Sequence, residues 1–207
     1  MTGSSILHDA AAGRAIIQPW TVEQYHEAIK HGFIEETTAY ELLDGLIVRK
    51  DRAKAGEDPT TVGDRHRIVV TRLAHLAPQF EPLGSFLQSQ QPIALPPHDE
   101  PEPDAAIVRG SLEKYLDHPP GAADVLSVIE VADSSLSRDL GIKLRLYAAA
   151  GIGQYIVVDL VHDQVLVHEQ QTSGGFGEPT ALKAGQALHI RAAAGKTVTV
   201  EVVRLLP

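Results

Sequence analysis

Two strongly apolar segments with a helical pattern between them constrain the fold of this chain most. Residues 125–131 and 154–159 have apolar side chains on both faces of an extended chain, which is typical of buried strands. Between them, residues 138–150 have the pattern of a helix, and Gly151 suits the left-handed position after its last turn. A strand, a helix and a second strand in this order predict a right-handed parallel crossover. We therefore expect an α/β (α+β) fold, a mixed β-sheet flanked by helices.

The remaining segments add helices and strands to this unit. Thr21 and Gln24 form a capping-box pattern that predicts a short helix. The pair Asp44-Gly45 between two apolar runs predicts a hairpin within residues 40–48, because both turn residues tolerate positive φ. Apolar side chains recur at helical spacing from Val62 to Phe80 and predict a helix there. Further strands are expected at residues 85–90, 91–95, 105–108 and 165–168, with others up to residues 197–203, and a helical turn at residues 111–116.

Length and composition indicate one folded unit. The chain has 207 residues, 43% of them hydrophobic, which is enough for a core. We expect a flexible N-terminal segment over residues 1–19 and a single domain over residues 20–207. The sequence contains no cysteine, which excludes disulfides and thiolate metal sites. Neither a signal-peptide pattern nor an apolar run of ~20 residues is present, so we predict a cytoplasmic protein that does not span a membrane.

Two carboxylates and one lysine form a candidate site. Asp104 stands at the start of the apolar run 105–108, and Glu130 lies within the apolar run 125–131. An ionised group inside a strand is costly unless it is paired, so Glu130 requires a cation nearby. Lys143 lies in the helix that follows. Two carboxylates, a lysine and an open coordination position suit phosphodiester hydrolysis by a hard metal ion.

Each of these residues also has a purely structural alternative. Asp104 could cap the loop before its strand, and Glu130 could be a buried carboxylate paired with a basic side chain. Lys143 could lie on a helix surface and pair with Asp139, four residues earlier. Glu41, on the predicted hairpin, either faces solvent or adds a third carboxylate to the site.

Other polar residues are interpreted as structural. His66 lies on the apolar stripe of its helix and is predicted to be a hydrogen-bonded helix histidine and not a ligand. No set of histidines has the spacing of a zinc site, and we predict no zinc. Tyr147 is expected to pack or hydrogen-bond beside Lys143, and Asp159 to cap the turn after its strand.

In this order and spacing, the residues resemble the Uma2 family. The likeness covers about residues 21–168 and rests on residues 40–45, Pro103-Asp104, Ile129-Glu130-Val131, Asp139, Lys143, Tyr147, Gly151 and residues 155–159. That family has the PD-(D/E)XK nuclease fold, so the resemblance implies a restriction-endonuclease-like mixed sheet. The chain departs from the parent motif at Ala132, where that motif has its lysine. The resemblance implies that Lys143, on the next helix, takes that place.

The resemblance also implies a chemistry. A metal ion would lie between Asp104 and Glu130, with a backbone carbonyl near Val131 as a further ligand, while Lys143 orients the attacking water. Mg²⁺ or Mn²⁺ is the expected cofactor, because oxygen ligands favour hard cations. We predict an endonuclease that hydrolyses phosphodiester bonds of DNA and works as a homodimer. Glu41 is a further candidate for its catalytic site.

Two other functions stay open. A net charge of −9 argues against a large basic groove and suits a binding or regulatory module that has the nuclease fold without useful turnover. Hydrolysis of a glycoside needs two carboxyl groups ~5–10 Å apart and is a weaker alternative. Aromatic side chains that could stack on a sugar are sparse, since Trp20 is the single tryptophan.

Overall fold

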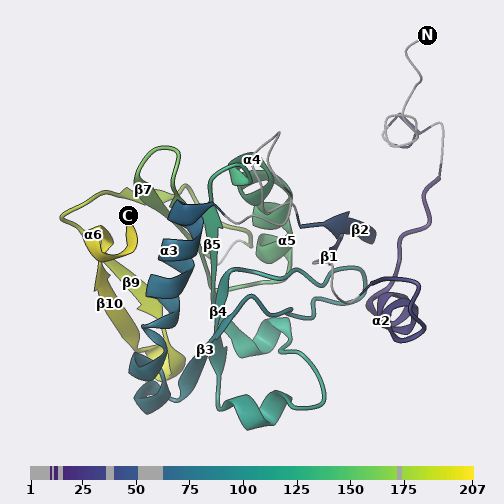
Figure 1. Cartoon of the computed structure of the whole chain (residues 1–207), viewed down its shortest axis with the longest axis horizontal. Helices are drawn as coiled ribbons and strands as arrows, with labels where there is room; N and C mark the ends of the chain where they lie inside the picture. Colours follow the sequence, from purple (N-terminus) through teal and green to yellow (C-terminus); the bar gives the residue numbers. More distant parts are fainter. Residues whose placement is uncertain (1–9, 11, 14–15, 36–39, 51–62, 172–173) are drawn as a thin grey trace.

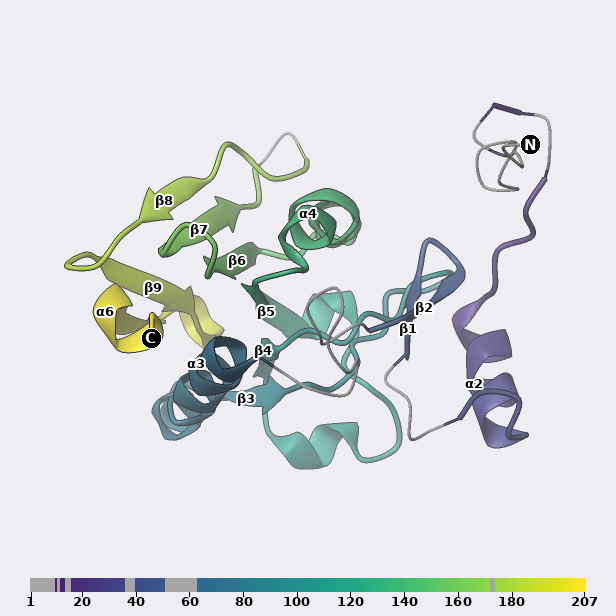
Figure 2. The same ribbon diagram turned by 45° about the horizontal axis from the view of Figure 1, so that its top comes forward.

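A six-stranded mixed sheet is the centre of the computed structural model, which describes residues 10, 12–13, 16–35, 40–50, 63–171 and 174–207. Its strands lie side by side in the order β3-β4-β5-β6-β7-β8, as Figure 2 shows. The pair β5–β6 is parallel and the other neighbours are antiparallel. The strands are β3 (Ser85–Ser89), β4 (Ala105–Arg109), β5 (Val125–Ala132), β6 (Gln154–Asp159), β7 (Gln164–Glu169) and β8 (Thr180–Leu182).

The predicted parallel crossover is present, and its helical connection has three parts. These parts are α4 (Leu136–Arg138), the π-helical turn η5 (Asp139–Lys143) and α5 (Leu144–Ala149). Gly151 has φ +74°, the left-handed conformation expected after a helix end. Every residue of β5 and β6 is buried, as expected for central strands covered on both faces.

Two layers cover the sheet (Figure 1). On one face, a mainly aliphatic core is enclosed by α3 (Asp64–Ala74), the hairpin β9–β10 (Ala187–Arg191 and Thr197–Glu201) and α6 (Val202–Leu205). On the other face, α5 and its buried Tyr147 pack on β4, β5 and β6. Odd- and even-numbered residues of β4 and β5 therefore face different layers. Asp104 and Glu130 are even-numbered, like the residues of these strands that pack against α5.

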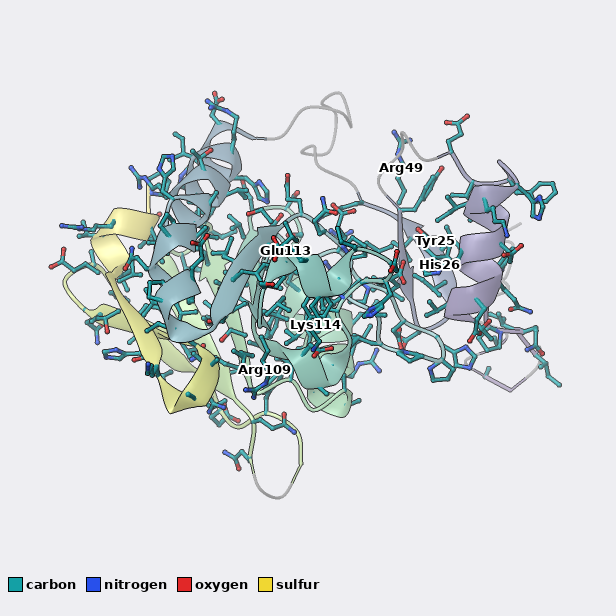
Figure 3. The ribbon with its side chains drawn as sticks, turned by 90° about the horizontal axis from the view of Figure 1, so that it is seen from below. Tyr25, His26, Arg49, Arg109, Glu113 and Lys114 are labelled. Carbon is teal, nitrogen blue, oxygen red and sulfur yellow. The ribbon has the colours of Figure 1, made fainter. Side chains whose placement is uncertain are left out.

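A small N-terminal unit lies beside the second layer. It consists of α2 (Val22–Lys30) and the hairpin β1–β2 (Tyr40–Leu43 and Leu46–Arg49), in which Asp44 and Gly45 have φ of 51° and 70°. The capping box at Thr21 and this hairpin are as predicted. Tyr25 and His26 project from α2 towards β1 in Figure 3, where the Tyr25 hydroxyl donates to the backbone oxygen of Tyr40. Short 3₁₀ turns cover residues 77–79, 81–83, 112–115, 122–124 and 193–195.

Several predicted boundaries are wrong. The helix expected over residues 62–80 ends at Ala74 and continues as 3₁₀ turns, since Pro78 has no N–H to donate along an α-helix. Residues 91–95 form no strand and make only isolated bridges, because Gln90 turns the chain at φ 51°. The last strand ends at Glu201, and the helix expected from residue 138 starts at Leu136.

Some sequence predictions fall outside what the structure describes. Val62 and most of the proposed flexible segment 1–19 lie outside the described residues. The division into that segment and a single domain over residues 20–207 stays a prediction. Within the described ranges, no helix has the length and apolarity that crossing a bilayer requires.

Candidate active site

The pairing of β4 with β5 places the two predicted carboxylates together. Ala105 is the partner of Ile129 in this antiparallel pair, so Asp104 and Glu130 stand at the next step of the ladder. The backbone N–H of Val131 donates to Asp104 Oδ2 at 2.9 Å, which ties the aspartate to the strand of Glu130. Asp104 and Glu130 are 3% and 2% exposed. Both carboxylates are therefore held inside the fold at one edge of the parallel pair.

Lys143 points inward to these carboxylates and not to solvent. Its ammonium lies 2.8 Å from Glu130 Oε1 and 2.7 Å from Glu41 Oε1, and its side chain is 1% exposed. The Tyr147 hydroxyl donates to Glu130 Oε1 at 3.0 Å. The predicted place of Tyr147 beside the lysine is confirmed, and the solvent-facing alternative for Lys143 is wrong.

The π turn explains how the helix delivers the lysine. A π turn inserts one extra residue per turn, and such turns are frequent at functional sites. Asp139 and Lys143, the first and last residues of η5, are both buried, at 2% and 1% exposure. Ser135 donates to the Asp139 carboxylate at 2.6 Å, which holds the start of the turn.

Glu41 belongs to the same cluster. It is fully buried on β1, and the backbone N–H of Glu102 donates to its Oε1 at 2.9 Å. The hairpin therefore brings a third carboxylate to Lys143, and the solvent-facing alternative for Glu41 is wrong. The lysine links two carboxylates from different elements, one on β1 and one on β5.

Asp104 is surrounded by a second set of groups. His66 Nε2, on α3, lies 3.1 Å from Asp104 Oδ2, the oxygen that also accepts the Val131 N–H. Lys50, directly after β2, donates to the backbone oxygen of Glu102 at 2.6 Å, and its ammonium is 3.8 Å from Asp104 Oδ1. That oxygen is buried and has no hydrogen-bond partner among the described residues. Glu41 Oε2 and His66 Nδ1 are likewise buried without a hydrogen-bond partner among the described residues.

Burial and charge shift the pKa of these groups in opposite directions. Burial raises the pKa of Glu130 to about 8, although Lys143 acts against this shift. Burial would also raise the pKa of Asp104, but the hydrogen bond from His66 and the charge of Lys50 prevail and lower it. Burial alone would lower the pKa of Lys143, yet the carboxylates around it raise it, so the lysine stays charged.

A pocket opens onto these residues. Its enclosed volume is ≈ 50 Å³, which has room for an ion or a few waters. The pocket is lined by the predicted site residues Asp104, Glu130, Val131 and Lys143. Its other lining residues, which were not predicted for the site, are Lys50, Gly63, His66, Gln90, Asp133, Ser134, Ser135, Arg138 and Asp139.

The donor set is compatible with a hard divalent cation. In the part of the chain that the structure describes, no three His, Asp or Glu side chains converge as a ready-made metal cage. Mg²⁺ needs only one or two carboxylates, with the remaining positions filled by water or substrate. Among the described residues, Asp104 supplies a buried oxygen without a hydrogen bond. The hydrogen bonds that Lys143 and Tyr147 donate to Glu130 both use Oε1 and leave Oε2 for an ion. The absence of cysteine excludes thiolate ligands, and the carboxylates of the pocket favour a hard cation.

Sequence reasoning missed part of this site. His66 is a hydrogen-bonded helix histidine as predicted, but the sequence did not indicate that its partner is Asp104. Lys50 and Arg138 also line the pocket, and no sequence pattern singled them out. Asp159 does cap its turn, since its carboxylate accepts the N–H groups of Val161 and His162 at 3.0 and 3.1 Å. The signal that could have revealed His66 is its position on a helix face that packs on the sheet.

Comparison with known proteins identifies the family and the fold. The sequence profile of the Uma2 family, described as "Putative restriction endonuclease", matches residues 22–201. The chain belongs to the Uma2 family. A crystal structure from Anabaena variabilis ATCC 29413, described as "a putative nuclease belonging to DUF820", superposes with a TM-score of 0.65 at 12% identity. The match covers 90% of this Uma2 chain and 97% of the other, and it establishes the fold. No curated protein matches.

Proposed function

We propose that this Uma2 protein is a Mg²⁺- or Mn²⁺-dependent endonuclease that hydrolyses phosphodiester bonds of DNA. The family and the restriction-endonuclease-like fold support a nuclease. The observation on which the metal dependence and the site depend is the convergence of Asp104, Glu130 and Lys143 on one pocket. Asp104 and Glu130 form an acidic pair in which Asp104 Oδ1 has no hydrogen bond among the described residues, and such a pair favours a cation. A metal-dependent nuclease needs a cation next to the phosphate that it cleaves.

Asp104, Glu130 and the backbone carbonyl of Val131 would hold the ion. When bound, such an ion polarises a phosphate and lowers the pKa of a coordinated water. Within the chain itself, Lys143 keeps the Glu130 carboxylate in a fixed orientation through a 2.8 Å ion pair. Its positive charge would also offset the negative charge that develops on a phosphate in the pocket. Glu41 and Tyr147 hold the lysine and the glutamate from either side.

Cleavage of supercoiled plasmid in Mg²⁺ or Mn²⁺ tests this proposal. We expect nicking or linearisation by the wild type and its loss, by at least about a hundredfold, in Asp104→Asn, Glu130→Gln and Lys143→Met. Lys114→Met is the matched control, because Lys114 pairs with Asp124 at 2.7 Å on the exposed turn at residues 112–115. Wild-type rates in all three pocket variants would overturn the assignment.

A binding or regulatory module is the second candidate. The net charge of −9 favours it, since an acidic surface opposes the phosphate backbone of DNA. In that case the protein would gain thermal stability in Mn²⁺ and yet cut no nucleic acid.

We also propose a homodimer, the assembly that cuts both strands of a duplex symmetrically. Light scattering during size-exclusion chromatography would show a single-chain mass if this is wrong.

A further inference from the structure

Among the described residues, three lysine or arginine side chains line the pocket, and two of them already contact carboxylates or a backbone oxygen. Lys143 contacts the carboxylates of Glu41 and Glu130 at 2.7 and 2.8 Å. Lys50 donates to a backbone oxygen at 2.6 Å, and the carboxylates of Glu102 and Asp104 lie 3.7 and 3.8 Å from its ammonium. The charge of both lysines is therefore compensated by groups of the protein itself.

Arg138 differs from both lysines. It is the last residue of α4 and lines the same pocket. Among the described residues, its guanidinium forms no ion pair within 4.0 Å, and its Nε is buried without a hydrogen-bond partner. An unsatisfied buried donor costs about 1–3 kcal/mol, and a charged one costs more. A group from outside the chain would remove that cost.

We infer that Arg138 binds a non-bridging phosphate oxygen of the substrate backbone. This inference rests on the proposed nuclease function and names the residue that holds the phosphate chain in the pocket. A guanidinium presents parallel N–H groups that match two phosphate oxygens, which an ammonium cannot do. Arg138 directly precedes the π turn that carries Lys143, so one helical segment brings the phosphate-binding group and the site lysine to the same pocket.

The neighbours of Arg138 suit this role. Asp139 is buried, and Ser135 donates to its carboxylate at 2.6 Å, so this aspartate is held by its own helix. The positive charge of Arg138 acts to lower the pKa of Asp139, against the larger effect of burial, which raises it. The small side chains of Ser134 and Ser135 beside Arg138 leave room at the pocket wall for a phosphate.

Binding without cleavage separates this inference from the proposed function. The probe is a fluorescein-labelled 20-base-pair DNA duplex in EDTA, followed by anisotropy from 25 to 200 mM NaCl. The variants are Arg138→Gln, which removes the charge, and Arg138→Lys, which retains it without the planar fork. Arg109→Gln is the matched control, since Arg109 is exposed at the end of β4 opposite to Asp104 (Figure 3).

We expect the Kd of Arg138→Gln to rise about tenfold, with the slope of log Kd against log salt reduced by about 1. Arg138→Lys should restore the slope and only part of the affinity, and Arg109→Gln should behave as the wild type. Equal Kd and slope for Arg138→Gln and the wild type would overturn the inference and leave the nuclease proposal intact. A wild type that neither binds nor cleaves DNA would instead remove the proposed function, and this inference with it. If Arg138→Gln does not fold, as judged by circular dichroism, the decision passes to Arg138→Lys, for which wild-type affinity would overturn the inference.

Discussion

Glu130 and Asp104 stand opposite each other, one step beyond the pair Ala105–Ile129, and yet have different surroundings. The Oε1 atom of Glu130 accepts from Lys143 at 2.8 Å and from Tyr147 at 3.0 Å. The short contacts of Asp104, from His66 and the Val131 N–H, go to Oδ2. Among the described residues, the ammonium of Lys50 is the nearest cation to Oδ1, at 3.8 Å. The Glu130 carboxylate is thus held by a close cation, whereas Asp104 has one oxygen without a hydrogen bond among the described residues.

The difference suggests a division of labour within the pocket. The lysine half of the pocket consists of Lys143 with Glu41 and Glu130. It fixes the positions of these side chains, because their charges are paired at short distance and shielded from water. The aspartate half consists of Asp104 with His66 and Lys50, and its Oδ1 atom is the oxygen that would bind a metal ion. The pKa directions differ in the same way, since His66 and Lys50 lower the pKa of Asp104, whereas burial raises the pKa of Glu130 against the charge of Lys143. The predictions below test the two halves separately.

The largest effect should come from removing the lysine. We expect Lys143→Met to lower the free energy of unfolding by about 3–5 kcal/mol, because it leaves Glu130 and Glu41 buried without their cation. Urea denaturation at pH 7 measures this loss. Lys114→Met removes a lysine from a pair of equal length, 2.7 Å, that is exposed to solvent (Figure 3), and it should change stability little. Similar losses in both variants would contradict an anchoring role for Lys143.

Much of the lysine half could be predicted from the sequence. The apolar neighbours of Glu130 already require that it be buried, and a buried carboxylate requires a cation. The helix after β5 was the obvious source of that cation. Its π turn could not be foreseen, because η5 has no composition that distinguishes it from α-helix, and only packing of Asp139 and Lys143 against the sheet selects it.

The aspartate half was less predictable. Lys50 directly follows β2 and His66 lies on α3, both far from Asp104 in the sequence, and nothing local indicates that they meet it. The strand expected over residues 91–95 was wrong for a related reason, since Gln90 adopts positive φ without being glycine. Contacts between distant segments decide these features, and a single sequence contains no record of such contacts.

The next effect concerns pH and tests whether Glu130 is a proton-linked ligand. Burial raises its pKa to about 8, so below that pH a cation must displace a proton from it. The affinity for Mn²⁺ should therefore increase by up to about tenfold per pH unit from pH 6 to 8 and then level off. Isothermal titration calorimetry in two buffers of different ionisation enthalpy would show the released proton. Glu130→Gln is the control and should bind more weakly with a shallower pH dependence. An affinity that stays constant over this range in the wild type would contradict the linkage.

The smallest effect should come from His66, which orients the aspartate from outside the pocket centre. The carboxylate makes Nε2 the donor, so His66→Ala removes one charge-assisted hydrogen bond from Asp104 Oδ2 and should cost about 1–3 kcal/mol of stability. His66→Gln could still donate an N–H and should retain part of that stability. A double-mutant cycle with Asp104→Asn gives the coupling directly, and we expect about 0.5–3 kcal/mol between two groups in contact. If His66→Ala costs the same in the Asp104→Asn background, the histidine packs against α3 and the sheet without holding the aspartate. The free Oδ1 would then depend on the Val131 N–H alone.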